Sequence, residues 1–351
     1  MADDLVIGWD AGGAHLKAAL LRGGRVAGVV QTASALWQGL DRLDTALDAV
    51  LAGWPEAMNA RHAATMTGEL ADCFEHRRQG VAAIAERLAN KLGPRLRLFA
   101  ADGRWIEPAC ACDEWAGIAS ANWLATARWR AQGTPDALLV DVGSTTTDLV
   151  PVVAGRLAAG GHDDAARLVG GELVYQGVVR TPLCSLGPRI AFRGVERNVM
   201  NELFASSADV YRLTGELDAE HDQQPAADNA GKDRVATQRR LARMIGLDAR
   251  DAGDGEWSSF AAAWRQKQRA LLRDNAARVV AASGLGPDAP IVGAGCGHFL
   301  ARALASALQR PYRTIDTLIP VDEPWRGWAR VAAPCVALAL LAAQEDAACG
   351  W

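Results

Sequence analysis

Two acidic residues stand at the ends of apolar runs in this sequence, and a glycine follows each of them two positions later. Asp10 lies in DLVIGWDAGGAHLKAAL (4–20), and Asp141 lies in DALLVDVGSTTTDLV (136–150). Backbone amides beside a glycine can approach an anion closely because glycine has no Cβ. Serine and threonine hydroxyls supply further donors. We therefore predict two phosphate-binding turns, with the contacting residues Gly12, Gly13, Gly143, Ser144 and Thr145.

Charged side chains accompany both turns. Mg²⁺ is usually held by one or two carboxylates together with waters and phosphate oxygens. Asp10 and Asp141 are therefore predicted to hold or orient this ion, directly or through water. Lys17, in the first segment, is the predicted positive partner of a phosphate group. The alternative is a pair of ordinary hairpins with glycine turns and surface hydroxyls.

The two segments are copies of one pattern. Aligning Asp10 on Asp141, an offset of 131 residues, brings further pairs together without a gap: Gly12 with Gly143, Lys17 with Asp148, and Gly24–Arg25 with Gly155–Arg156. Each copy has a buried strand, a tight turn, a second strand, and a Gly-Arg turn into a third strand. Repetition at this long period predicts two homologous halves, because the repeats of a solenoid would be far shorter.

A third glycine-rich segment occurs late in the chain, in APIVGAGCGHFLARALASAL (289–308). An apolar strand leads into Gly293, Gly295 and Gly297, and an amphipathic helix follows. Such a layout can place a phosphate or a ribose against backbone at a helix N-terminus. Gly293 and Gly295 are therefore candidate ligand-binding residues.

Composition excludes several classes of protein. The chain has 351 residues, half of them hydrophobic, and a net charge of −4. No nucleic-acid partner is expected, because no basic block could neutralise phosphates over a long surface. No membrane partner is expected, because no apolar run reaches the ~20 residues that span a bilayer. Seven cysteines, an odd number, fit a reduced protein of the cytoplasm.

Strand and helix patterns alternate around the two copies, which predicts an α/β protein of two related lobes with a cleft between them. The predicted lobes are residues 1–135 and 136–351. Helical patterns dominate 198–285, the predicted helical insertion in the second lobe, and 329–344 is the predicted closing helix. The polar stretches 218–233 and 248–257 are predicted loops, either a lid or solvated connectors.

The segments GWDAGGAHLK, VDVGSTTTD and VGAGCG occur in the order of the phosphate-one, phosphate-two and adenosine elements of the actin/hexokinase-like (ribonuclease H-like) ATPase superfamily, which they resemble. Within it the chain is similar to the hydantoinase/oxoprolinase-related group. More narrowly, it resembles the proteins of tetrahydromethanopterin-linked one-carbon metabolism that act in methanofuran or methylofuran biosynthesis. The narrower resemblance rests on TMTGELADCF (65–74), GIASANWLATA (117–127), VGGELVYQGVVRTPLCSL (169–186), NELFASSADVYRLTGEL (201–217) and GKDRVATQRRLARMIG (231–246).

This resemblance implies an ether-forming transferase. It would join an aminomethylfuran-methyl diphosphate to the phenol oxygen of a tyramine or tyrosine derivative and release diphosphate. Mg²⁺ is the implied cofactor, and ATP is left open as a ligand but is not consumed. The partners are the small-molecule furan diphosphate and the phenolic acceptor, with homo-oligomerisation left open. Alternatives are an ATP-dependent small-molecule kinase, a hydantoinase/oxoprolinase-type amidohydrolase, and a non-catalytic nucleotide-binding regulator.

A phenol ionises near pH 10, so its attack would benefit from a nearby general base. Glu69, in TMTGEL, is the first candidate, and Glu172, in GGEL, is the second. The alternative for Glu69 is a surface carboxylate that starts a helix over 69–80, and the same caution applies to Glu172. His15 lies within the first turn, where the family pattern has a smaller polar residue, and it either contacts phosphate or faces solvent.

Overall fold

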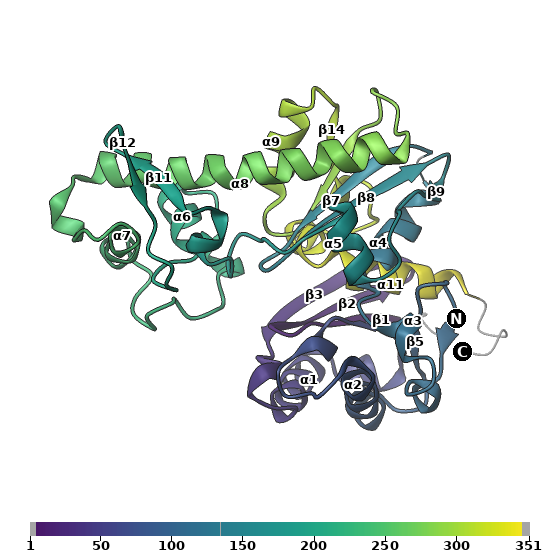
Figure 1. Cartoon of the computed structure of the whole chain (residues 1–351). Coiled ribbons are helices and arrows are strands. Elements are labelled where there is room, and N and C mark those ends of the chain that lie inside the picture. The colour runs from purple at the N-terminus through teal and green to yellow at the C-terminus, as the bar shows by residue number, and fades with distance from the viewer. Residues whose placement is uncertain (1–4, 134, 346–351) are drawn as a thin grey trace.

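Two mixed β-sheets, one in each half of the chain, form the framework of the computed structural model, which describes residues 5–133 and 135–345 (Figure 1). The first sheet has the order β3-β2-β1-β4-β5-β6. Its strands β1, β2 and β3 form an antiparallel meander, whereas β4 runs parallel to β1 and β5 runs parallel to β4. The strands are β1 (Leu5–Ala11), β2 (His15–Arg22), β3 (Arg25–Ala33), β4 (Arg61–Met66), β5 (Leu96–Phe99) and β6 (Trp105–Ile106).

The second sheet repeats this connectivity. Its order is β10-β8-β7-β13-β14, and β9 also pairs with β8. Strands β7 and β8 are antiparallel, β13 runs parallel to β7, and β14 runs parallel to β13. The predicted duplicated, actin/hexokinase-like α/β fold is therefore confirmed. The strands are β7 (Ala137–Val142), β8 (Thr147–Val153), β9 (Arg156–Leu157), β10 (Leu173–Val174), β13 (Ile291–Ala294) and β14 (Tyr312–Thr314).

The distal hairpin turns show the duplication at the level of single backbone angles. Gly23 and Gly24 have φ of +56° and +76°, and the equivalent Ala154 and Gly155 have +51° and +69°. Two consecutive residues with positive φ are typical of the type I′ turn, whose twist matches that of the flanking strands. The turn therefore favours glycine at its second central position, which is Gly24 in the first copy and Gly155 in the second.

Helices cover both sheets. In α1 (Asp41–Gly53) the buried residues Leu43, Ala46, Leu47 and Val50 recur with helical spacing, so one face of this helix packs on the sheet. Helix α2 (Arg77–Leu92) lies beside it on the same side (Figure 1). The shorter helices are α3 (Trp115–Ile118), α5 (Asp164–Gly170), α9 (His298–Ala307) and α10 (Arg326–Val331).

Two helices pack between the sheets and connect the lobes (Figure 1). Helix α4 (Asn122–Ala131) contacts β8 and β9 of the second sheet, and α11 (Ala333–Gln344) contacts β1, β2 and β4 of the first. The last helix of each half thus packs on the sheet of the other half. Gly8 permits the approach of α11, since a Cβ there would lie 1.9 Å from the carbonyl oxygen of Cys335.

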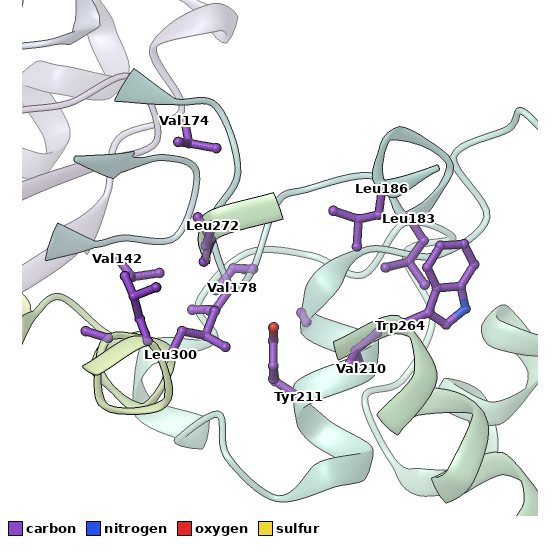
Figure 2. Close-up of a cluster of buried hydrophobic side chains, with 14 of the residues drawn as sticks. Val142, Val174, Val178, Leu183, Leu186, Val210, Tyr211, Trp264, Leu272 and Leu300 are labelled. Carbon is purple, nitrogen blue, oxygen red and sulfur yellow. The ribbon is translucent and has the colours of Figure 1, made fainter. Parts of the chain in front are cut away.

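The insertion between β10 and β13 extends away from the second sheet (Figure 1). It contains β11 (Arg189–Phe192), β12 (Val195–Asn198), α6 (Ser207–Thr214), α7 (Arg234–Arg243) and the 30-residue α8 (Asp254–Ser283). One hydrophobic cluster joins it to the lobe: Figure 2 shows Val142 and Leu300 of the lobe near Val178 and Leu272, with Tyr211 and Trp264 beyond them. This shared core anchors the insertion.

Within the described ranges, none of the helices combines the length and the apolar character that crossing a bilayer requires.

Candidate active site

The two Asp-Gly turns face one cavity between the lobes. In the first turn the Gly12 amide donates to the His15 carbonyl at 3.0 Å, and in the second the Gly143 amide donates to the Thr146 carbonyl at 2.9 Å. A cavity of about 110 Å³ lies between them. Its walls include the predicted residues Asp10, Gly12, Gly13, Lys17, Asp141, Gly143, Ser144 and Thr145. The structure thus brings together residues that lie 131 positions apart in the sequence.

Strand register places the charges of this cavity. Asp10 pairs with Lys17 across β1 and β2, and Asp141 pairs with Asp148 across β7 and β8. Burial raises the pKa of Asp10, although Lys17 and a hydrogen bond from Asn122 oppose this shift. Burial and the adjacent Asp148 raise the pKa of Asp141 to about 7. Burial by itself would lower the pKa of Lys17, but Asp10 and Asp141 reverse the direction and keep it protonated.

These side chains suit a magnesium ion whose remaining ligands are phosphate oxygens and water. Asp10 is only 4% exposed, and its Oδ1 has no hydrogen-bond partner among the described residues, so a carboxylate oxygen is available for a ligand. No group of three or more metal-binding side chains converges within residues 5–133 and 135–345. Asp10 and Asp141 would therefore hold Mg²⁺ together with phosphate oxygens and water, which is the usual arrangement for this ion.

The four consecutive hydroxyls divide by position, because residues 144–146 lie in the turn and Thr147 begins β8. Thr147 is fully buried, and its hydroxyl donates to the Gln176 carbonyl at 2.7 Å. Ser144 and Thr145 face the cavity with their hydroxyl oxygens 3.4 Å apart, and Thr146 also lines it. Three of the four hydroxyls are therefore available to a ligand.

The segment from Gly177 to Arg180 supports the second turn from behind. The amide of Val178 donates to the Gly143 carbonyl at 3.0 Å, and those of Val179 and Arg180 donate to the Ser144 carbonyl at 3.0 and 2.9 Å. This contact requires glycine at position 177, because a Cβ there would lie 2.4 Å from the Ser144 carbonyl carbon. The same bonds bring the Arg180 guanidinium to the site, where it packs 4.8 Å from the Trp37 ring centroid.

A second cavity, of about 320 Å³, adjoins the first. The two share walls that include Gly13, Thr67, Asn122, Thr145 and Asp148. The other walls of the second cavity include three aromatic rings and two arginines: Trp37, Trp123, Tyr175, Arg167 and Arg180. Arg167 stacks 3.9 Å from the Trp123 ring centroid and forms an ion pair with Asp148 at 2.8 Å. This cavity suits a planar aromatic group next to a phosphate site.

Glu69 lies behind the wall of this second cavity, in a 3₁₀ turn over Gly68–Leu70. Its side chain is 1% exposed, and burial raises its pKa to about 7. Ser120 Oγ lies 2.7 Å from Glu69 Oε1 and 2.9 Å from Asp164 Oδ2. Ser120 and Asp164 line the cavity, whereas Glu69 reaches it only through Ser120.

Glu172 and His15 are engaged with protein groups. The Glu172 carboxylate accepts the amides of Gly160 and Gly161 at 2.6 and 3.1 Å, so this residue ties down a loop. Burial lowers the pKa of His15 to about 3, which keeps the ring neutral. Its Nε2 lies 3.0 Å from Gln224 Nε2, so the segment 218–233 of the insertion rests on the first turn.

Gly293 and Gly295 lie at β13, apart from the walls of both cavities. A Cβ at Gly293 would lie 2.4 Å from the Tyr312 hydroxyl, and one at Gly295 would lie 2.2 Å from the Val142 carbonyl oxygen. Both glycines allow close packing inside the second lobe. Their assignment to ligand binding stays a prediction.

Several residues of the site were not predicted from the sequence. Asn122 and Ser120 lie in GIASANWLATA, and Arg180 lies in VGGELVYQGVVRTPLCSL, two segments that carried the family resemblance. Their position in those segments was the available signal. Trp37 and Asp164 lie outside them, and nothing in their local sequence indicates a site.

The mirrored turns, duplicated sheets and interlobe cavities define an actin/hexokinase-like protein. Residues 61–321 match the model of the hydantoinase/oxoprolinase family, and the chain belongs to that family. The nucleotide-free structure of acetone carboxylase has a similar fold, with a TM-score of 0.54 and 11% sequence identity, over 95% of this chain and 70% of that one.

Two relatives have the same name, (4-{4-[2-(gamma-L-glutamylamino)ethyl]phenoxymethyl}furan-2-yl)methanamine synthase. The protein from Methanocaldococcus jannaschii is 30% identical over 272 residues, which covers 77% of this chain and 80% of the relative. The protein from Methanococcus vannielii is 47% identical over 73 residues, which covers 21% of this chain and 32% of the relative. Both relatives are thus named as enzymes.

Proposed function

We propose that this protein is a transferase of methanofuran or methylofuran biosynthesis. It joins an aminomethylfuran-methyl diphosphate to the phenol oxygen of a tyramine or tyrosine derivative and releases diphosphate. The observation that carries this proposal is the shared wall between a cavity built from two mirrored Asp-Gly turns and a larger cavity lined by aromatic rings. The cavity between the turns holds the diphosphate, and the aromatic cavity holds the phenol. The reacting atoms lie where the two cavities meet.

The first cavity supplies what a departing diphosphate needs. Negative charge develops on the leaving oxygen as its bond to the furfuryl carbon breaks, and preorganised donors and cations stabilise such charge. Lys17 supplies a half-buried positive charge, and the hydroxyls of Ser144 and Thr145 supply donors. Mg²⁺, when bound by Asp10 and Asp141, would neutralise phosphate charge as a Lewis acid.

The bond changes balance without ATP. The phenol oxygen forms a bond to the furan-bearing methylene carbon, the bond from that carbon to diphosphate breaks, and the phenol proton passes to a base. Trp37, Trp123 and Tyr175 enclose the cavity in which the phenol ring would lie. The furan ring delocalises positive charge at the reacting carbon, so the protein mainly stabilises the leaving group and orients the acceptor.

The relatives support the same chemistry. The name of both relatives describes a phenoxymethyl group attached to a furan, which is an ether of the kind that the proposed reaction forms. The M. jannaschii relative aligns over 77% of this chain.

The test is incubation of the purified protein with Mg²⁺, a furfuryl-type diphosphate and a phenol. Tyramine, tyrosine and their glutamyl derivatives would each be supplied as acceptor. Release of diphosphate together with an ether product, identified by mass spectrometry, is the expected result. Asp141→Asn should lose this turnover and stay folded, while the exposed control Asp288→Asn should keep it.

Other outcomes would refute the proposal. Near-normal turnover by Asp141→Asn would remove that residue from the mechanism. Consumption of Mg-ATP with phosphorylation of a small molecule, or with opening of an amide ring, would replace the transferase by a kinase or an oxoprolinase-type amidohydrolase.

A further inference from the structure

Two carboxyl groups from different lobes meet at one serine hydroxyl. Ser120 Oγ lies 2.7 Å from Glu69 Oε1 and 2.9 Å from Asp164 Oδ2, and both distances are those of hydrogen bonds. Glu69 and Ser120 belong to the first lobe, and Asp164 begins α5 of the second. The row of three oxygen atoms therefore crosses the cleft beside the aromatic cavity.

The number of available protons limits which of these two contacts can be a hydrogen bond. A serine hydroxyl has a single proton and can donate it to one carboxylate at a time. The second contact is a hydrogen bond only when the other carboxyl carries a proton and donates it to Ser120 Oγ. One additional proton thus completes the row, and it can reside on Glu69 or on Asp164 without movement of any heavy atom.

The two ends of the row differ in solvation. Glu69 is 1% exposed, and its Oε2 has no hydrogen-bond partner in the described part of the chain, so its ionised form is poorly solvated. Asp164 lines the cavity and has Arg77 Nη1 3.8 Å from its Oδ2, so this end of the row lies beside open space and a cation. Ser120 has a φ of +51°, a strained value for a residue other than glycine. Such strain is often concentrated at functional sites.

We propose that Asp164 accepts the proton of the phenolic acceptor, that Ser120 relays it, and that Glu69 stores it. This inference rests on the proposed function and makes the general base a pair of carboxyl groups. As the phenol oxygen bonds to the furfuryl carbon and diphosphate leaves, the phenol proton moves to Asp164 Oδ2. Asp164 passes a proton to Ser120 Oγ, which gives its own proton to Glu69 Oε1. The net change is one proton moved from phenol to Glu69.

The relay ends at a carboxylate, Glu69, whose raised pKa makes it a better acceptor for a phenol proton than an ordinary carboxylate. An ordinary exposed aspartate is a weak base for a phenol, because its pKa lies far below that of the phenol. The buried Glu69 has a pKa raised to about 7 by desolvation, so a proton stored there is held more firmly. The other charged groups around the cavity are Arg77, Asp72, Arg180, and the paired Asp148 and Arg167. Of these, Arg77 is the one that forms an ion pair with the row.

The kinetic test compares three substitutions with one control. Glu69→Gln keeps the shape of the side chain but cannot store a proton. Ser120→Gly breaks the row and suits the positive φ. Asp164→Asn removes the acceptor at the cavity. The control is Asp288→Asn, which changes an exposed carboxylate outside the walls of both cavities.

Saturating Mg²⁺ and furan diphosphate should keep Asp141 ionised, so kcat of the wild type should rise with pH through about 7 following the ionisation of Glu69. Each of the three substitutions should abolish this inflection and lower kcat at pH 8 by about a hundredfold, the usual size of general-base catalysis. The KM for the furan diphosphate should change little in the three variants, and kcat of the control Asp288→Asn should equal that of the wild type at every pH. Retention of the inflection near pH 7 by Glu69→Gln or Ser120→Gly would overturn the relay.

An infrared titration detects the proton shared by the three side chains and does not require catalytic turnover. Asp141 also titrates near pH 7, so the Glu69 band is taken as the difference between the C=O stretching spectra of the wild type and Glu69→Gln. This difference band should disappear with a midpoint near pH 7, and its midpoint should change in Ser120→Gly. A wild type that lacks this band would overturn the relay even if the ether forms. A titrating band in a protein that forms no ether would instead refute the proposed function.

Discussion

Replacement of Gly177 by alanine tests whether the second turn depends on support from behind. The added Cβ would lie 2.4 Å from the Ser144 carbonyl carbon and 2.5 Å from the Gly143 carbonyl oxygen, whereas ordinary contact begins at 3.4 Å. The backbone must therefore separate by about 1 Å. Overpacking of this kind costs about 1–3 kcal/mol. Weakening the three amide bonds from Val178, Val179 and Arg180 adds up to about 1 kcal/mol each.

We expect Gly177→Ala to lower the free energy of unfolding by about 2–4 kcal/mol, measured by urea titration of tryptophan fluorescence. Its affinity for Mg-pyrophosphate, measured by calorimetry, should fall about tenfold or more, because 1.4 kcal/mol lost at the turn corresponds to that factor. The matched control is Gly255→Ala in α8, where the added Cβ meets no atom within 4 Å. Equal unfolding midpoints and equal affinities for Gly177→Ala and the wild type would refute the reasoning.

Three further changes have defined outcomes. Gly8→Ala would place a Cβ 1.9 Å from the Cys335 carbonyl oxygen, so thermal unfolding should show a loss of about 3 kcal/mol or more. Burial lowers the pKa of His62 to about 4, so the unfolded chain binds more protons below pH 6.5, and acidification from pH 7 to 5 should cost about 2 kcal/mol through this residue. His62→Gln, which keeps an acceptor for Trp9 Nε1, should remove that part of the loss in urea titrations at the two pH values. Arg180→Met should raise the KM for tyrosine about tenfold and leave the KM for tyramine unchanged, because only tyrosine offers a carboxylate to the guanidinium.

The features that the sequence predicted well are those specified by local chemistry. Gly24 and Gly155 mark turns whose backbone angles favour glycine, so the same turn recurs at the same offset in both halves. Apolar runs ending in Asp10 and Asp141 predicted strands, and the strand ends place both carboxylates at one cavity. The helix after β13 followed in the same way from its amphipathic pattern.

Features that depend on the approach of distant segments were not predictable. Ser120 and Asp164 come together only because the two lobes close on each other. The glycines of the third motif illustrate a second limit, since a missing Cβ serves a ligand and a close protein contact equally well. Gly293 lies against Tyr312, and no local pattern distinguishes that contact from a nucleotide. The roles assigned to the site residues and the lobe boundary near residue 135 stay predictions.

The exchange of helices between the lobes has a consequence for how the protein is made. Strands β1 and β2 are translated before α11, so the surface that α11 covers stays bare until residues 333–344 have also been translated. The hydrophobic layer of the first sheet is therefore completed only after the second sheet has been synthesised. Early release of a truncated chain would expose that layer, and such fragments should be substrates for chaperones and proteases.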